Sequence, residues 1–293
     1  MSISPNWKLI YAARNRAAQE GEGIAEIYGF SEPPIDPFSI IENERDLIHA
    51  GGFDFGNAFD GRIKYVGPRF LISYNTKYNK WQHSGRFHTK ILFTVAHELG
   101  HFFLPEHREY LVTSKSPHGS LTEFTANQRV EQQADAFASG LLMPSYLLRP
   151  LINHANFPPL EYIHQIRKQF QVSLTGLLVR WTQLSDFPCV TIAIKDKKIQ
   201  YGWISKSLRD LGAYAVLRGS TVKGRDALTF IDQDPEVRRF RHATGNGAII
   251  NWVDFDQVRL LTEEHFFAIP HTGTVWVIAT ADENDLNYGD YDS

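Results

Sequence analysis

Two histidines one helical turn apart constrain this 293-residue chain more than any other feature. His97 and His101 are four positions apart, so on an α-helix both imidazoles project from the same side and can meet at one point. A neutral imidazole binds Zn²⁺ at about 2.0–2.1 Å. Glu98 would then stand beside the metal, where a general base takes a proton from a water molecule. The pattern predicts a zinc site with His97 and His101 as ligands and Glu98 as the catalytic base.

The residues around this pattern are predicted to form a buried helix. Its apolar positions recur with the spacing of one buried stripe: Leu92, Val95, Ala96, Leu99 and Phe103. Thr89 is a candidate N-cap, and Pro105 is expected to end the helix. A surface helix with solvated histidines is the alternative, but a helix this apolar is mostly buried, and buried His and Glu side chains need partners.

A catalytic zinc ion needs a third protein ligand, and a second predicted helix over residues 129–143 offers one. Glu131 and Asp135 lie four apart in its polar part. Glu131 is the expected ligand, and Asp135 is expected to hold a ligand imidazole in the required tautomer. A solvated acidic face is the alternative for this pair, and Glu123 is the rival third ligand. Zn²⁺ suits these ligand types best, although Mn²⁺ or Fe²⁺ also occupies such sites.

The segment between the two helices is expected to be a loop that carries further histidines. His107 or His118 could stabilise an oxyanion, but a surface histidine is the favoured interpretation of both. A basic cluster nearer the C-terminus is likewise interpreted as a solvated face: Arg238, Arg239, Arg241 and His242.

The two helices together resemble the ImmA/IrrE family of metallopeptidases. The resemblance rests on residues 93–101 (FTVAHELGH), Glu131, Ala134, Phe137, Ala138 and residues 141–144 (LLMP), with Phe59-Asp60-Gly61 and Tyr74-Asn75 upstream. It extends over residues 25–185 and departs from the family pattern at Leu92 and Asp135, where Arg and Asn are common. The resemblance implies cleavage of a helix-turn-helix transcriptional repressor at one site, which would induce genes for DNA repair and radiation resistance.

The predicted fold class is α+β in several domains, a layout similar to the IrrE branch of that family. Residues 1–158 are expected to form a zinc-metallopeptidase-like domain with the HExxH helix and a small sheet. Residues 159–185 resemble a helix-turn-helix, with Ser173 as the N-cap of its second helix. Residues 186–281 resemble a GAF-like α/β sensor domain, and residues 282–293 form an acidic flexible tail.

Individual elements are predicted from periodicity and turn residues. The N-terminal part is expected to contain a helix over 7–29 whose apolar stripe is interrupted at Gly21 and Gly23, a helix over 40–50, and strands over 61–66 and 69–75. The C-terminal part is expected to contain a hairpin of 190–195 and 198–203, strands over 248–253 and 273–279, and helices near 205–209 and 234–244.

Composition restricts the function further. The net charge of −3 shows no global basic excess that would indicate nucleic-acid binding, although a local basic patch could still exist. The single cysteine, Cys189, is interpreted as a core residue, and its isolation favours a reducing cytoplasm. No segment is long and apolar enough to span a membrane, and the N-terminus lacks a signal-peptide pattern. A protease inside a cell is expected to be specific, because a broad one would attack the proteins of its own cell.

Two functions are compatible with these patterns. The first is a cytoplasmic zinc-dependent endopeptidase that cleaves a helix-turn-helix repressor. The second is a DNA-binding transcriptional activator whose peptidase-like domain is not catalytic, with Arg167, Lys168 and Arg180 as its modest positive face. The complete His97, Glu98 and His101 set favours the first, because Glu98 is not needed for structure. A helical hairpin packed on the peptidase domain is slightly favoured over direct DNA binding for residues 159–185.

Overall fold

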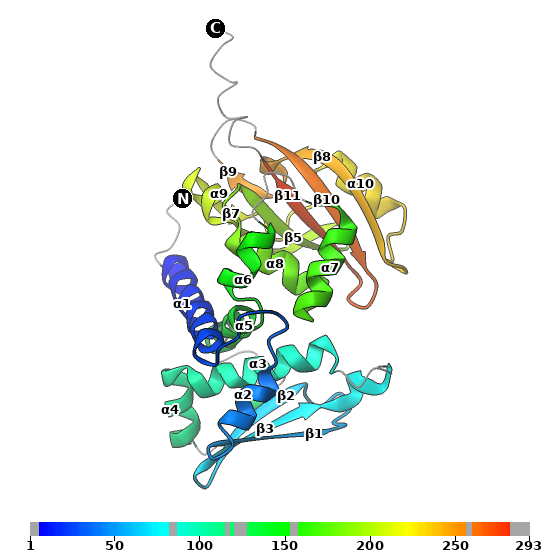
Figure 1. The fold of residues 1–293 in the computed structure, drawn as a ribbon. Helices are drawn as coiled ribbons and strands as arrows, with labels where there is room; N and C mark the ends of the chain where they lie inside the picture. Colours follow the sequence, from blue (N-terminus) through cyan, green and yellow to red (C-terminus); the bar gives the residue numbers. More distant parts are fainter. Residues whose placement is uncertain are drawn as a thin grey trace. The chain divides into compact units, whose positions relative to one another are not determined.

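The structure, a computed structural model, describes residues 6–81, 87–114, 118–119, 128–152, 158–255 and 260–281 (Figure 1). The chain divides into two compact units. Unit 1 consists of Met1–Leu148 with Arg167–Ser173, and unit 2 consists of Arg149–Ile166 with Leu174–Ser293. Both helices and sheets are present, which confirms the mixed α+β class.

Unit 1 contains a four-stranded sheet in the order β1-β3-β2-β4. Its strands are β1 (Ile48–Phe53), β2 (Gly61–Val66), β3 (Arg69–Asn75) and β4 (His118–Gly119). Strand β1 is parallel to β3, and the other pairs are antiparallel. The bounds of β2 and β3 confirm the prediction. The predicted helix over 40–50 is wrong in its second half, because α2 (Pro37–Asn43) ends early and β1 follows.

The helices of unit 1 pack against this sheet and against one another. They are α1 (Asn6–Ile27), α2, α3 (Thr89–Phe103), α4 (Pro105–Ser114) and α5 (Gln128–Leu142), with the 3-10 helix η1 (Thr76–Trp81) before α3. Helix α3 is the predicted HExxH helix, and it contacts both β2 and β3. Its N-cap is His88 rather than Thr89, since the His88 side chain accepts a hydrogen bond from the backbone N–H of Lys90. Pro105 does more than end α3, because it begins α4.

Helix α1 is continuous through Gly21 and Gly23, which confirms the predicted helix over 7–29. A Cβ atom at Gly21 would lie 2.2 Å from the carbonyl oxygen of Phe137, and one at Gly140 would lie 2.0 Å from that of Ala18. The backbones of α1 and α5 therefore approach too closely for any side chain at these two glycines. This contact fixes the position of α5, which carries Glu131.

Unit 2 is built on a five-stranded antiparallel sheet in the order β6-β5-β11-β10-β8. Its strands are β5 (Cys189–Lys195), β6 (Lys198–Ile204), β8 (Arg241–Ala248), β10 (Leu261–Ile269) and β11 (Thr274–Thr280). Two short strands, β7 (Ala213–Val216) and β9 (Val253–Phe255), pair separately. The β5–β6 hairpin confirms the prediction, and its turn residues Asp196 and Lys197 both have positive φ, of 51° and 56°.

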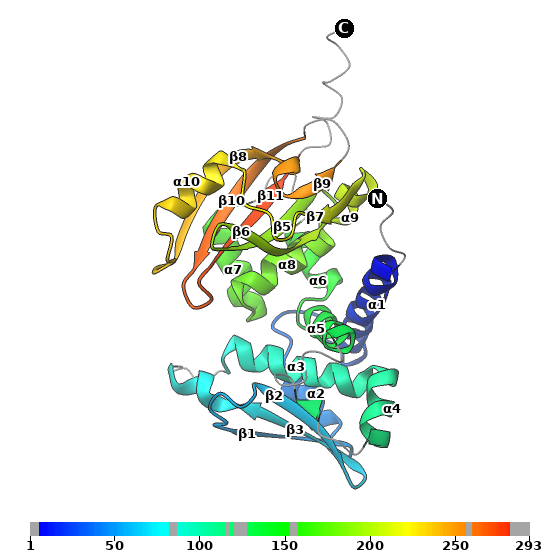
Figure 2. The same cartoon turned by 180° about the vertical axis from the view of Figure 1, so that it is seen from behind.

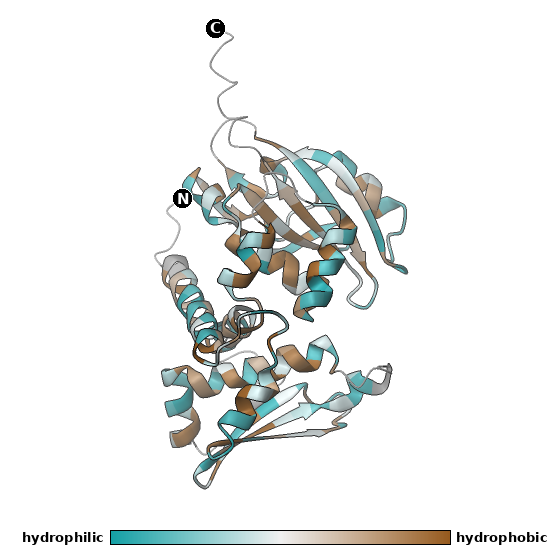
Figure 3. Cartoon of the chain, in the orientation of Figure 1, coloured by the Kyte–Doolittle hydropathy of each residue, from teal (hydrophilic) through white to brown (hydrophobic). Residues whose placement is uncertain are grey.

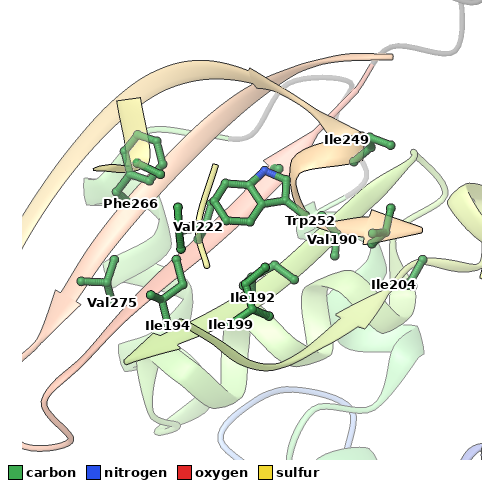
Figure 4. Packing of buried hydrophobic residues seen from close by; sticks show 14 of the residues in the cluster. Val190, Ile192, Ile194, Ile199, Ile204, Val222, Ile249, Trp252, Phe266 and Val275 are labelled. Carbon is green, nitrogen blue, oxygen red and sulfur yellow. The ribbon is translucent and has the colours of Figure 1, made fainter. Parts of the chain in front are cut away.

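Helices cover both faces of this sheet. Helix α8 (Leu174–Leu184) and the start of α7 (Leu160–Phe170) lie on one face, and α10 (Arg225–Asp232) lies on the other, as Figure 1 and Figure 2 show from opposite sides. The remaining helices are α6 (Ser145–Ile152), α9 (Lys206–Asp210) and η2 (Ile249–Asn251). On the α10 side, Trp252 lies at the centre of an apolar cluster with Val222, Ile249 and Phe266 (Figure 4).

Two predictions for this unit are wrong. The predicted helix over 234–244 is a turn followed by the start of β8, and the predicted strand over 248–253 is mostly η2. Strand β8 was missed because residues 241–247 are mostly polar and do not alternate with apolar residues. Their side chains are exposed or only partly buried. The pairing of β8 with β10 along eight residues fixes the strand instead.

Helix α8 presents no exposed residue. Its side chains are largely apolar (Figure 3). The hydroxyl group of Thr182 forms a hydrogen bond of 2.6 Å with that of Thr191 on β5. Arg180, part of the predicted positive face, is buried, whereas Lys168 on α7 is exposed. Arg180 therefore does not contribute to an exposed positive face on this helix, and the helix-turn-helix and GAF-like assignments remain predictions.

Other surface and core predictions have clear outcomes. Cys189 is fully buried, which confirms its interpretation as a core residue. Burial raises the pKa of its thiol to about 11. Arg238 is exposed and pairs with Glu236, while Arg241 donates hydrogen bonds to Gln233 and to the Phe230 carbonyl. Among the helices that the structure describes, none combines the length and apolar character needed to cross a membrane.

Glu264 on β10 is a buried carboxyl in the core of unit 2. Its Oε1 accepts hydrogen bonds from Trp252 Nε1 at 2.6 Å and Thr262 Oγ1 at 3.1 Å. Within the described part of the chain, Oε2 has no hydrogen-bond partner. Burial raises the pKa of Glu264 to about 6, and the two hydrogen bonds only partly oppose this effect.

We expect Glu264 to make unit 2 less stable as the pH rises. Its pKa is raised on folding, so its stabilising contribution is fully present below the ordinary value of 4.5 and is lost as the pH rises through about 6. The shift corresponds to about 2 kcal/mol of unfolding free energy. Urea unfolding of wild type and Glu264→Gln at about pH 4.5 and about pH 7.5 measures it. The free energy of unfolding of the variant, relative to wild type, should be higher at about pH 7.5 than at about pH 4.5. An equal difference in unfolding free energy at both pH values would contradict the assignment.

Candidate metal centre

The side chains of His97, His101 and Glu131 converge on one point between α3 and α5. His97 Nε2 lies 3.1 Å from His101 Nε2. Glu131 places one oxygen 3.2 Å from His97 Nε2 and the other 3.6 Å from His101 Nε2. Both histidines are buried, and Glu131 is half-buried. Among the described residues, this is the group of His, Cys, Asp or Glu side chains able to hold a metal ion.

The spacing of these atoms fits a shared metal ion. Two ligand atoms that each lie about 2.0–2.1 Å from a tetrahedral zinc ion are about 3.3 Å apart. The two Nε2 atoms are 3.1 Å apart, and the two oxygens of Glu131 lie 3.2 and 3.6 Å from one nitrogen each, so the observed separations bracket that value. Two imidazole nitrogens and a carboxylate oxygen also form the donor set that zinc hydrolases use, with a fourth position left for water or substrate. The residues present therefore fit a catalytic divalent ion.

A second set of contacts orients the two imidazoles. Asp135 Oδ1 lies 2.9 Å from His97 Nδ1. His107 Nδ1 lies 3.1 Å from His101 Nδ1, and His107 Nε2 lies 3.1 Å from Gln133 Oε1. Both ligand rings are thus held at Nδ1, which leaves Nε2 of each directed at the other and at Glu131.

The electrostatics of the centre favour a positive charge. Burial lowers the pKa of His97, but the hydrogen bonds to Asp135 and Glu131 outweigh it and raise the value to about 10. Without a metal ion, a proton on His97 is therefore stabilised by two carboxylates. A divalent cation bound to His97 Nε2 would replace the proton on that nitrogen, and Glu131 and Asp135 would stabilise its charge as well.

Glu98 lies on α3 beside this group, buried at 1 % exposure. A Cβ atom at Gly61 would lie 2.7 Å from Glu98 Oε1 and 2.3 Å from Thr94 Cγ2. The backbone of Gly61, the first residue of β2, therefore packs against the carboxylate, and a larger residue there would force the Thr94 or Glu98 side chain to move. The sheet fixes the rotamer of Glu98 from one side.

The loop that brings Gly61 to Glu98 is held by two polar side chains. Asn75 is buried and donates hydrogen bonds to the carbonyl oxygens of Gly56 and Phe59. Asp60 accepts a hydrogen bond from Tyr78 and forms an ion pair with Lys90 at 3.0 Å. Burial raises the pKa of Asp60, but these partners outweigh it and lower the value. Asp60 is therefore a fixed negative charge next to Gly61.

The predicted site residues fall into three groups. The structure brings His97, His101, Glu131 and Asp135 together and places Glu98 on the same helix. Glu123, the rival ligand, and the side chain of His118 lie outside the described residues. The favoured interpretation of His107 as a surface histidine is wrong. His107 lies on α4 and is buried against His101.

Sequence reasoning also missed Gln133 and Gly61. Pro105 could have revealed α4, and with it the position of His107, because proline is common in the first turn of a helix. No local signal marks Gln133, whose role depends on how α5 packs beside α4.

Comparison with known proteins agrees with this site. Residues 67–182 match the peptidase M78 family model, described as the IrrE N-terminal-like domain. This segment contains His97, Glu98, His101, Glu131 and Asp135, and the match confirms the resemblance seen in the motifs. No curated protein sequence matches the chain significantly. Among solved structures, a Mycobacterium tuberculosis transcriptional regulator is similar, with a TM-score of 0.57 and 13% identity over 97% of this chain and 84% of that chain. At this identity the similarity shows a shared fold alone.

Proposed function

We propose that this protein, whose residues 67–182 form an IrrE N-terminal-like peptidase domain, is a metal-dependent endopeptidase that cleaves a helix-turn-helix transcriptional repressor at one site. The observation that carries the proposal is the convergence of His97 Nε2, His101 Nε2 and Glu131 at separations suited to one zinc ion. A buried carboxylate, Glu98, stands beside them.

The side chains divide the work of peptide hydrolysis. His97, His101 and Glu131 would hold the ion, which when bound polarises a peptide carbonyl and lowers the pKa of a water molecule. Glu98 accepts the proton of the attacking water and passes it to the nitrogen of the leaving amine. The backbone at Gly61 keeps the Glu98 carboxylate in place during both transfers. Asp135 holds the imidazole of His97 through its Nδ1.

The motif resemblance supports a regulatory substrate, because it implies a helix-turn-helix repressor whose loss induces DNA-repair and radiation-resistance genes. Unit 2, with its separate core, supplies a second body that could sense a signal or hold the repressor. Zinc is the proposed metal, and the cytoplasm is the proposed location.

The alternative of a DNA-binding activator with a non-catalytic domain has less support. It requires a recognition helix with an exposed basic face, and α8 has no exposed residue, with Arg180 buried. It also leaves the buried Glu98 beside the His–His–Glu group without a role.

The test is incubation of the purified, zinc-loaded protein with helix-turn-helix repressors from the same genome. We expect one repressor to be cut at a single peptide bond, located by mass spectrometry. A chelator should stop the reaction, and zinc should restore it. Failure to cut any of these repressors by a protein that binds one zinc ion per chain would contradict the proposed substrate class.

A further inference from the structure

His107 and Gln133 form a hydrogen-bonded chain behind His101, and we propose that this chain selects the tautomer in which His101 binds the metal. His101 Nδ1 lies 3.1 Å from His107 Nδ1, and His107 Nε2 lies 3.1 Å from Gln133 Oε1. His101 and His107 are only 1 % and 5 % exposed. The inference rests on the proposed metal site and assigns positioning roles to two further residues.

The two hydrogen bonds run in one direction because the last acceptor is the side-chain carbonyl oxygen of Gln133. Gln133 Oε1 carries no hydrogen and can only accept, so the hydrogen of that bond is on His107 Nε2. A neutral imidazole has one N–H, which makes His107 Nδ1 an acceptor. The hydrogen of the next bond is therefore on Nδ1 of His101. With its hydrogen on Nδ1, His101 presents the lone pair of Nε2 to the metal position.

His101 Nε2 is the atom that faces the metal position, 3.1 Å from His97 Nε2 and 3.6 Å from Glu131. If Gln133 instead turned its NH₂ group to His107, each bond would reverse. His101 Nε2 would then carry a hydrogen and could not bind a metal ion. The amide orientation of Gln133 is thus coupled, two hydrogen bonds away, to the ligand atom.

The two histidine ligands are supported in different ways. The Asp135 carboxylate accepts from His97, and its side chain is 58% exposed. His101 lies deeper, where an unpaired carboxylate would carry a large desolvation penalty. A neutral imidazole and a neutral amide perform the same task there without adding a buried charge.

Substitutions at Gln133 separate this role from a general structural one. Gln133→Met keeps the size and removes the acceptor, and His107→Phe keeps a ring and removes both nitrogens. We expect each to weaken zinc binding about 10–100-fold. Gln133→Glu retains an acceptor and should bind zinc at least as tightly as wild type. Gln132→Glu, which adds the same charge one residue away, is the matched control for electrostatic attraction. Affinities are measured on the full-length protein by competition with a chelator of known zinc affinity.

Nitrogen NMR of the histidine rings gives a second readout. In the zinc-loaded wild type, His107 should be the neutral tautomer protonated at Nε2, and Gln133→Met should mix its tautomers. Wild-type zinc affinity in Gln133→Met, or a hydrogen on His107 Nδ1 in wild type, would overturn the inference and leave the metal site intact. If wild type itself binds no zinc, the proposed function fails together with the inference.

Discussion

Replacing Glu98 with glutamine is expected to lower the rate of repressor cleavage about 10²–10⁴-fold while the protein keeps its metal ion. Glutamine has the shape of glutamate, so it fits the buried position against Gly61. Its neutral amide cannot take a proton from water. Glu98 is not one of the three converging ligand side chains, so zinc content should be unchanged.

The measurement compares initial cleavage rates and the zinc content of the purified variant with those of wild type. Glu106→Gln is the matched control, because it makes the same chemical change at an exposed position in the first turn of α4. The control should cleave at the wild-type rate. Unchanged cleavage by Glu98→Gln would falsify the assignment of Glu98 as the base.

Replacing His97 with alanine is expected to remove both the metal ion and the activity. His97 Nε2 makes the two shortest contacts of the ligand group, at 3.1 Å to His101 and 3.2 Å to Glu131. Loss of a neighbour that only orients a ligand weakens metal binding about 10–100-fold, and loss of the ligand itself should exceed that range. Glu131→Ala should behave in the same way, because it leaves two nitrogens and no carboxylate.

Zinc content after dialysis and the cleavage rate are the measured quantities. His49→Ala, on the exposed face of β1, removes a histidine far from the ligand group in sequence and serves as the control. Full zinc occupancy in either His97→Ala or Glu131→Ala would show that the ligands were assigned to the wrong residues.

The ligand group could be predicted from sequence because it depends on two local periodicities. His97 and His101 repeat at the helical spacing, and Glu131 and Asp135 repeat at the same spacing on a second amphipathic helix. The approach of α5 to α3 could not be read from the chain. It depends on α1, whose Gly21 fits against α5 at a separation that no side chain allows. In the sequence, Gly21 is visible only as a break in the apolar stripe of the predicted helix.

The parts of the site that escaped prediction depend on tertiary contacts. His107 lies in a short helix of weak amphipathic character, and its partner Gln133 is contributed by α5. Gly61 acts through the space that it leaves for Glu98. In the sheets, β1 was missed because Gly51 and Gly52 weaken its strand pattern. Gly52 nevertheless has a packing role, because a Cβ atom there would lie 2.5 Å from the ring of Tyr74. Strand β8 was missed because pairing with β10, and not burial of its side chains, defines it.

The central claim is that one divalent ion is held by His97, His101 and Glu131. Anomalous X-ray diffraction at the zinc absorption edge, from crystals of the zinc-loaded protein, tests it most directly. The account predicts one strong peak per chain, about 2.0–2.2 Å from Nε2 of both histidines and from an oxygen of Glu131. A zinc-loaded crystal with no peak at this position, or with the ion bound by other side chains, would contradict it.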